Sequence, residues 1–338
     1  MRYNPIFDYW VAVSENRKLR QNDFQSNPAS VPENPSCSCP FCEGHEHETP
    51  HELDAMLPEK SLDNYRCPDG PGWMIRAVPN RFPFVTPDNE MTLQQMGPHI
   101  CAPDVGRQEV IVDVPFHAKS PSELNAEEFQ YLIYFYHRRM HQARKSGRWR
   151  YVQLFKNQGY SAGASISHIH SQAAALPFVP TAILQEQTFL RGYREQNQRC
   201  YHCEVLDFER TVGWRWVCET EFFAAFCPFA SRFPGELHIL PKRHTPCFVE
   251  SQREELDDLA ILLRRLLHDF ERKFSPSCYN LVFKNTPWTY DAAGVHTDPN
   301  FHWRLEILPR TTRMAGFEFG TGCYVNQMSP ETAAKRWM

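Results

Sequence analysis

His168-Ile169-His170-Ser171-Gln172, in the middle of the chain, matches His302-Trp303-Arg304-Leu305-Glu306 near its end. Each pentapeptide begins with the last member of a set of metal-type ligands, and the two sets occur in the same order in the two halves. The first set is Cys39, Cys42, His117 and His168, and the second is Cys200, Cys203, His244 and His302. We infer that the chain is internally duplicated. The second copy has lost the histidine that follows the last ligand by two positions.

The duplication extends to the secondary structure expected between the ligands. Residues 152–157, Val-Gln-Leu-Phe-Lys-Asn, match residues 280–285, Asn-Leu-Val-Phe-Lys-Asn, and both segments predict buried strands. A segment with helical periodicity precedes each strand: residues 125–143 in the first half, and a stretch that starts at a Ser251/Glu254 capping box in the second. We therefore predict an α+β fold of two tandem halves, 1–185 and 186–338, each an antiparallel β-sheet covered by a helix.

Composition narrows the classes of function. The chain has 338 residues, 42% hydrophobic and 22% charged, as expected of a globular protein with a sizeable core. Its formal net charge of −4 argues against duplex nucleic acid as a partner. No apolar run approaches the roughly 18 residues of a membrane span, and no secretion signal precedes the first strand. We expect a cytoplasmic enzyme with no membrane or nucleic-acid partner.

The recurring cysteines and histidines predict two structural metal sites. A Cys-x-x-Cys turn can present two thiolates to one ion, and two distant imidazoles complete the Cys2His2 tetrahedron that zinc occupies in closed sites. Four protein ligands leave no open position for water, so the metals would hold strands and loops in place. We expect two zinc ions per chain. The alternative is that these residues are buried thiols and hydrogen-bonded core histidines.

His170 is the candidate nucleophile. If a metal fixes His168, strand alternation returns His170 to the same face, and a neutral imidazole can attack phosphorus while its other nitrogen is held by a carbonyl. Gln172 can donate to a phosphoryl oxygen. A run of small residues follows Asn157, including Gly163, Ala164 and Ser165, and its backbone N–H groups can approach a phosphate. From the residues alone, His170 could also be a structural histidine or an extra metal ligand.

These motifs resemble the histidine-triad superfamily, and within it the galactose-1-phosphate uridylyltransferase family. The resemblance covers essentially the whole chain. The matching segments are Cys39-Pro40-Phe41-Cys42, Pro79-Asn80-Arg81-Phe82-Pro83, the block 155–172 and the C-terminal stretch 316–334.

The resemblance implies a ping-pong nucleotidyltransferase. His170 would accept the nucleotidyl group from a nucleotide-sugar, release hexose 1-phosphate, and pass the group to a second phosphate-bearing acceptor. It also implies that Gln172 assists catalysis and that the enzyme is a homodimer in which the sugar-contacting segment comes from the partner subunit. The residues that match nucleotide- and phosphate-binding positions are Arg17, Arg20, Asn80, Asn157, Gly163, Ala164, Ser165 and Gln172. Those that match sugar-binding positions are Phe317, Glu318 and Tyr324.

Departures from the family pattern leave the substrate open. Uridylyltransferases typically read His-Pro-His-Gly-Gln where this chain has residues 168–172, and the strings 161–165 and 316–324 are similar to plant-type ADP-glucose phosphorylases. The resemblance favours exchange between UDP-glucose and galactose 1-phosphate, and the alternatives are adenylyl transfer from ADP-glucose to phosphate and nucleotide hydrolysis. A further hypothesis is a non-catalytic domain, stabilised by zinc, that binds nucleic acid. The excess of acidic over basic residues disfavours it.

Overall fold

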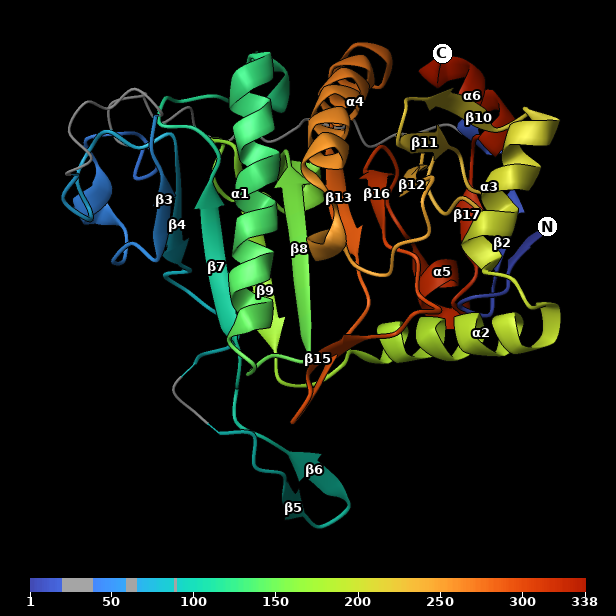
Figure 1. The fold of residues 1–338 in the computed structure, drawn as a ribbon. Coiled ribbons are helices and arrows are strands. Elements are labelled where there is room, and N and C mark those ends of the chain that lie inside the picture. The colour runs from blue at the N-terminus through green and yellow to red at the C-terminus, as the bar shows by residue number, and fades with distance from the viewer. Residues whose placement is uncertain (20–38, 59–65, 88–89) are drawn as a thin grey trace.

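A computed structural model describes residues 1–19, 39–58, 66–87 and 90–338 (Figure 1). Its centre is a ten-stranded sheet in the order β10-β11-β12-β16-β13-β8-β9-β7-β4-β3, and all neighbouring strands are antiparallel. Its strands are β3 (Asp54–Met56), β4 (Ile75–Pro79), β7 (Arg107–Val112), β8 (Tyr151–Gln158), β9 (His170–Leu176), β10 (Trp216–Glu219), β11 (Phe223–Phe226), β12 (Leu237–Pro241), β13 (Tyr279–Lys284) and β16 (Arg304–Pro309).

The strand order is symmetrical about its midpoint, which confirms the tandem-halves fold. From the midpoint outward, one side of the sheet contains β8, β9, β7, β4 and β3. The other side contains, in the corresponding positions, β13, β16, β12, β11 and β10. The halves meet where β8 pairs with β13, with Asn157 opposite Asn280. One continuous sheet therefore serves both halves. The expected boundary between residues 185 and 186 falls inside helix α2 (Thr181–Asn197).

Two long helices, α1 (Ala126–Lys145) and α4 (Arg253–Lys273), lie side by side over one face of the sheet (Figure 1). Their apolar faces form one core with the central strands. The capping box of α1 is at Asn125 and Glu128, where the sequence predicts a helix start. The α4 box is Gln252/Glu255, one residue later than predicted, because the buried Glu255 is held by Arg243 at 2.8 Å and caps the Gln252 amide.

The remaining elements lie around this core. Chain ends come together in a small sheet of β1 (Arg2–Asn4), β2 (Tyr9–Val13) and β17 (Tyr324–Asn326), next to the C-terminal helix α6 (Pro330–Trp337). A hairpin of β5 (Gln94–Met96) and β6 (His99–Cys101) projects away from the sheet (Figure 1). The other elements are α3 (Tyr201–Val212), α5 (Gly316–Thr321), and the hairpin of β14 (Trp288–Asp291) and β15 (Gly294–Thr297).

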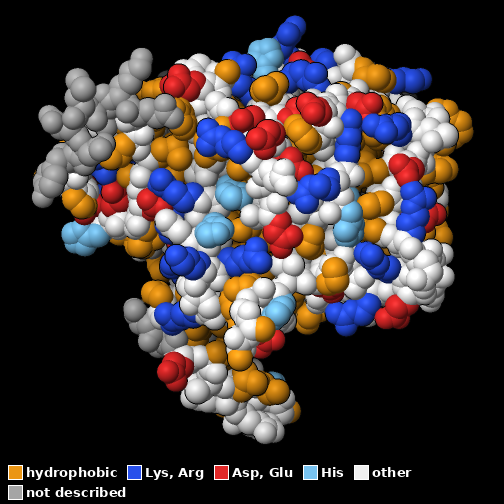
Figure 2. All heavy atoms as spheres, in the orientation of Figure 1, with side chains coloured by type: hydrophobic (Ala, Val, Ile, Leu, Met, Phe, Trp, Pro, Cys, Tyr) orange, Lys and Arg blue, Asp and Glu red, His pale blue; other side chains and the backbone are white. Residues whose placement is uncertain are grey.

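Charged side chains of both signs are interspersed over the face that carries α1 and α4, and no large area of one sign is visible there (Figure 2). Among the described residues, no helix combines the length and the apolar character that a membrane crossing requires.

Candidate metal sites and active site

The first set of predicted ligands comes together in space. The turn that carries Cys39 and Cys42 faces His117, which lies in the loop after β7, and His168, which lies just before β9. The Nδ1 atom of His168 lies 3.5 Å from Cys39 Sγ and 3.6 Å from Cys42 Sγ, and the Nδ1 atom of His117 lies 3.6 Å from Cys42 Sγ. Four donors from three segments of the chain therefore converge on one point.

The second set repeats this arrangement. Cys200 caps α3 and Cys203 lies in its first turn. The Nδ1 atom of His302 lies 3.9 Å from Cys200 Sγ and 3.6 Å from Cys203 Sγ, and the Nδ1 atom of His244 lies 3.6 Å from Cys203 Sγ. In each site the four donor atoms lie within 4.8 Å of one another.

The donor geometry fits a tetrahedral metal ion. With typical Zn–S and Zn–N bond lengths, a tetrahedral angle puts sulfur and nitrogen about 3.6 Å apart, close to the observed separations. The Nε2–H of His168 donates to the Val114 carbonyl at 2.9 Å, and that of His302 donates to the Pro241 carbonyl at 2.9 Å. These bonds fix the tautomer, because the proton resides on Nε2 and the lone pair of Nδ1 faces the sulfurs. Both clusters can hold a metal.

His170, the first residue of β9, has the opposite tautomer. Its Nδ1–H donates to the main-chain carbonyl of His168 at 2.8 Å, so Nε2 carries a lone pair, and Nε2 makes no hydrogen bond to any residue in the described part of the chain. The Phe41 ring packs edge-on against the imidazole at 5.3 Å between centroids. Burial lowers the pKa of His170, which keeps the ring neutral at neutral pH. A neutral, oriented imidazole is the form needed for attack.

A cavity of about 120 Å³ lies beside His170. The predicted phosphate-binding residues Asn157, Ala164 and Ser165 line it, together with Lys119, which the sequence analysis did not identify. The loop from Gly159 to Ile166 wraps it, and two backbone kinks at positive φ, +82° at Gly159 and +91° at Gly163, let it turn back toward β9. The second half anchors this loop, because Asn280 Nδ2 donates to Asn157 Oδ1 and to the Ala162 carbonyl, both at 2.8 Å.

A buried ion pair lies behind the candidate nucleophile. Lys156 Nζ donates to Asp113 Oδ2 at 2.5 Å and to the His170 carbonyl at 3.0 Å. Ser171 also donates to Asp113, at 3.3 Å, and its hydroxyl contacts that of Tyr136. Sequence reasoning missed this group, because a lone lysine and a lone aspartate separated by a helix carry no recognisable spacing.

The other predicted residues lie at varying distances from the cavity. Gln172 lies on the same strand as His170 and accepts a hydrogen bond from Gln108 Nε2 at 2.9 Å, which leaves its own amide free to donate. The main-chain N–H of Asn80 donates to the Gln108 carbonyl at 2.9 Å, and Asn80 does not line the cavity. Arg17 is exposed in a short 3-10 helix, Glu15–Leu19, and does not line the cavity. Arg20 lies outside the described residues.

The predicted sugar-binding residues are not brought to His170 within one chain. On α5, Phe317 is exposed and Glu318 is half-buried, and Tyr324 packs edge-on against Tyr9 and Phe233. None of the three lines the cavity beside His170.

Two duplicated halves, two Cys2His2 clusters and one oriented histidine beside a cavity are the features that the structure brings together. Residues 1–180 match the family described as galactose-1-phosphate uridyl transferase, N-terminal domain, and residues 115–338 match a domain of unknown function, DUF4921. The first match spans more than half of the chain. The chain belongs to the galactose-1-phosphate uridyl transferase family.

Two curated relatives are similar over the whole chain. The ADP-glucose phosphorylase of Arabidopsis thaliana is 31% identical over 99% of this chain and 91% of its own length. The galactose-1-phosphate uridylyltransferase of Thermotoga maritima is 29% identical over 99% of this chain and 96% of its own length.

Solved structures agree with this assignment. The crystal structure of an ADP-glucose phosphorylase from Arabidopsis thaliana with bound ADP-glucose superimposes with a TM-score of 0.81 at 29% identity, covering 99% of this chain and 96% of that one. A uridylyltransferase structure gives a TM-score of 0.74 at 26% identity, covering 94% of this chain and 93% of that one.

Proposed function

We propose that this protein is a nucleotidyltransferase that cleaves a nucleoside diphosphate hexose through a covalent intermediate on His170. One observation carries the proposal. His170 lines a cavity wrapped by the glycine-rich loop, residues 159–166, and its Nδ1–H donates to the His168 carbonyl, which leaves a lone pair on Nε2. Membership of a family of transferases and phosphorylases supports it.

The reaction runs in two displacements at phosphorus. In the first, the His170 Nε2 lone pair forms a bond to the α-phosphorus, and the bond from that phosphorus to the bridging oxygen breaks and releases hexose 1-phosphate. In the second, an oxygen of the acceptor phosphate attacks the same phosphorus and the P–N bond breaks, which returns the electron pair to Nε2. The Nδ1 proton stays on the ring throughout, because the His168 carbonyl holds it.

The surrounding residues position the phosphates. Asn280 donates to Asn157 Oδ1, so the N–H groups of the Asn157 side chain can donate to phosphoryl oxygens, as can the backbone N–H of Ser165. The backbone N–H groups of Gly163 and Ala164 donate to carbonyls within the loop. Lys119 adds a positive charge at the cavity. Gln172, held by Gln108, offers its amide on the same face as His170. Arg17, Arg20 and Asn80 are assigned to the nucleotide by resemblance.

We infer that both clusters hold zinc and that the metals are structural. Two thiolates and two imidazoles form a donor set that zinc prefers, and all four positions are taken by the protein. When bound, zinc supplies fixed geometry rather than an activated water. The first cluster then holds the main chain at His168, whose carbonyl orients His170.

Two substrate pairs are open. The sequence patterns of the family favour uridylyl exchange between UDP-glucose and galactose 1-phosphate. The Arabidopsis thaliana ADP-glucose phosphorylase favours adenylyl transfer to phosphate, since it is similar at 31% identity and its structure superimposes with a TM-score of 0.81. Because Phe317, Glu318 and Tyr324 lie away from His170 in their own chain, a homodimer in which a partner supplies this segment also belongs to the proposal.

Product analysis separates these candidates. The protein is incubated with ADP-glucose plus phosphate, and separately with UDP-glucose plus galactose 1-phosphate, and glucose 1-phosphate is measured. Release that requires the acceptor and is faster with one pair identifies the substrates. Equal release without any acceptor would instead identify a hydrolase, and no release in either mixture would contradict the proposal.

A further inference from the structure

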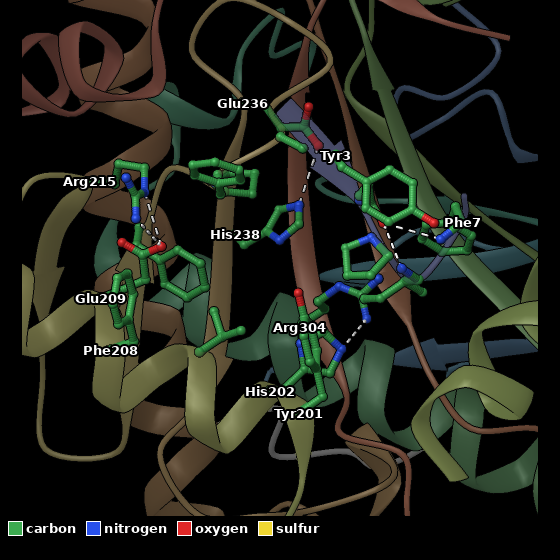
Figure 3. A pocket seen from close by; sticks show the side chains of 18 of the residues that line it. Tyr3, Phe7, Tyr201, His202, Phe208, Glu209, Arg215, Glu236, His238 and Arg304 are labelled. Atoms are coloured by element: carbon green, nitrogen blue, oxygen red, sulfur yellow. Dashed lines mark hydrogen bonds and ion pairs between the residues drawn. The ribbon is translucent and has the colours of Figure 1, made fainter. Parts of the chain in front are cut away.

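A second cavity, of about 430 Å³, lies in the second half of the chain (Figure 3). The N-terminal segment 3–9, helix α3 and strands β11, β12 and β16 surround it. Its size is that of a site for a small organic molecule. No residue that lines this cavity lines the one beside His170.

The duplication relates the two cavities. In the first half the Phe41 ring lies 5.3 Å from His170 and 6.1 Å from His168. In the second half His202 takes the place of Phe41, with Nε2 at 3.3 Å from Arg304 and its ring at 6.2 Å from His302. The large cavity therefore lies against the face of β16 that corresponds to the His170 face of β9, and Arg304 stands where the nucleophile would be.

The polar floor of this cavity sets two guanidinium groups against three carboxylates. Arg304 is paired with Glu186 and with Glu306, the latter at 2.8 Å. Arg232 bridges Glu306 and Glu236, at 2.9 and 2.8 Å. Every guanidinium is engaged with carboxylates, so the floor offers no free cation to a phosphate. A ligand with phosphate groups would lose its hydration there without gaining a counter-charge.

The walls are aromatic. Figure 3 shows His238 near the centre, with the Arg215–Glu209 pair to its left, Tyr3 and Phe7 to its right, and Arg304 and Tyr201 below it. Rings from the N-terminal segment, α3 and β11 and their flanking loops face the space, and they include Tyr9, Tyr201, Phe208, Trp214, Phe226 and Phe229. Such rings offer flat faces on which another flat ring can stack.

Three polar atoms along these walls have no hydrogen-bond partner among the described residues. His238 uses only Nε2, toward Glu236 at 3.3 Å, and leaves Nδ1 unpaired. The Tyr201 ring packs against neighbouring rings, and its hydroxyl makes no hydrogen bond to a described residue. Glu209 is 2% exposed and gives Oε1 to Arg215, while Oε2 has no partner. Of the three, Glu209 Oε2 is buried, and a buried polar atom is normally satisfied, so this wall indicates a ligand with polar groups at its edge.

We propose that this cavity binds an uncharged nucleoside, with the base stacked between aromatic walls and its edge bonded to His238, Tyr201 and Glu209. Its guanidinium groups are all paired with carboxylates, which distinguishes it from the cavity beside His170, where the loop of residues 159–166 favours phosphate. The inference rests on the duplication and on the cavity walls, and it holds whether or not His170 carries a nucleotidyl group.

Equilibrium dialysis of the full-length, zinc-loaded protein tests the proposal. The probes are labelled adenosine and uridine, and the corresponding nucleoside monophosphates. We expect saturable binding of at least one nucleoside, weakened at least about fivefold by Trp214→Ala and by Phe208→Ala, since losing a stacking ring costs at least that much. Monophosphate binding is expected to stay unchanged in both variants. Phe178→Ala, which removes a similarly half-exposed ring outside the cavity, serves as the control.

Two results would overturn the inference: no saturable nucleoside binding by the wild-type protein, or nucleoside binding that survives both Trp214→Ala and Phe208→Ala. Zinc content and melting temperature confirm that each variant is folded, and both rings are about half or more exposed, so their removal leaves the core intact. Nucleotidyl transfer, assayed in parallel, is expected to be normal in both variants. Its failure in the wild type would contradict only the proposed function.

Discussion

The ammonium of Lys156 donates a hydrogen bond to the main-chain carbonyl of His170, with 3.0 Å between Nζ and O. Strands β8 and β9 are paired as far as Phe155 and Gln172 and then separate to make room for the glycine-rich loop. The His170 carbonyl consequently has no main-chain partner on β8 among the described residues, and the side chain of Lys156, which lies on that strand, supplies one. Asp113 neutralises the buried charge. Lys156 therefore holds the backbone of the candidate nucleophile in place.

Lys156→Met is expected to slow formation of the His170 adduct and to lower the free energy of unfolding by about 3 to 5 kcal/mol, because it leaves Asp113 buried and unpaired. Lys156→Met combined with Asp113→Asn should regain part of the stability and none of the rate. Urea unfolding and rapid-quench adduct measurements check both effects. Lys284→Met, at the equivalent position in the second half, is the control, and an adduct rate in Lys156→Met that matches it would refute the positioning role.

Each metal cluster should contribute to folding separately. Cys39→Ser and Cys200→Ser are each expected to lose one of two bound zinc ions and to lower the melting temperature, because metal affinity adds to folding free energy. Zinc content by mass spectrometry and thermal unfolding are the measurements. The control is Cys67→Ser, which changes an exposed thiol outside both clusters. Full zinc content with an unchanged melting temperature in Cys39→Ser would exclude the first site.

The loop beside His170 depends on Gly159. A Cβ placed there would lie 2.4 Å from Cys278 Sγ, and the backbone has a φ of +82°. Gly159→Ala should therefore displace the loop and reduce turnover, and Cys278→Ala in the same chain should recover part of it. Gly97→Ala is the matched control, because Gly97 also has a positive φ, +60°, but nothing lies within 4 Å of its added Cβ. Equal turnover in the Gly159 and Gly97 variants would show that the contact with Cys278 is unimportant.

Arg304 should make stability depend on pH through Glu186. Burial alone would raise the pKa of Glu186, but Arg304 and then Lys284 hold it well below its ordinary value. The charged Glu186 therefore stabilises the fold above its unfolded pKa. In Arg304→Met burial dominates, so folding takes up a proton and the variant gains stability as pH falls. We expect the free energy of unfolding of Arg304→Met to lie about 3 to 5 kcal/mol below that of the wild type at pH 7. This difference should become smaller between pH 7 and 5, as measured by urea unfolding. A gap that is constant with pH would contradict this.

Much of the fold could be predicted because the duplication repeats its strongest signals. A single Cys-x-x-Cys or His-x-His is weak, but Cys39 and Cys42 recur with His117 and His168 in the same order as the second set, and the structure brings both sets together. The hydrophobic periodicity of residues 125–143 likewise identified α1, apart from two residues at its end. Repetition gave these assignments a test within the sequence itself.

The features that were missed depend on tertiary contacts between distant residues. The pairing of β8 with β13 merges the halves into one sheet, and no local pattern specifies which edges meet. Lys156 and Asp113 are separated by the whole of α1, and the floor of the second cavity joins residues from α2, the loop before β12, and β16. Such groups form only when the sheet assembles, so their chemistry is not visible in spacing.

The central claim is that one imidazole per chain carries the nucleotidyl group. Intact mass spectrometry of the protein mixed with ADP-glucose or with UDP-glucose, without acceptor, tests it most directly. We predict that one nucleoside monophosphate is added per chain, and that the added mass identifies the base. His170→Ala should gain no such mass and should retain both zinc ions. An adduct that persists in a folded His170→Ala protein, or two adducts on one wild-type chain, would contradict it.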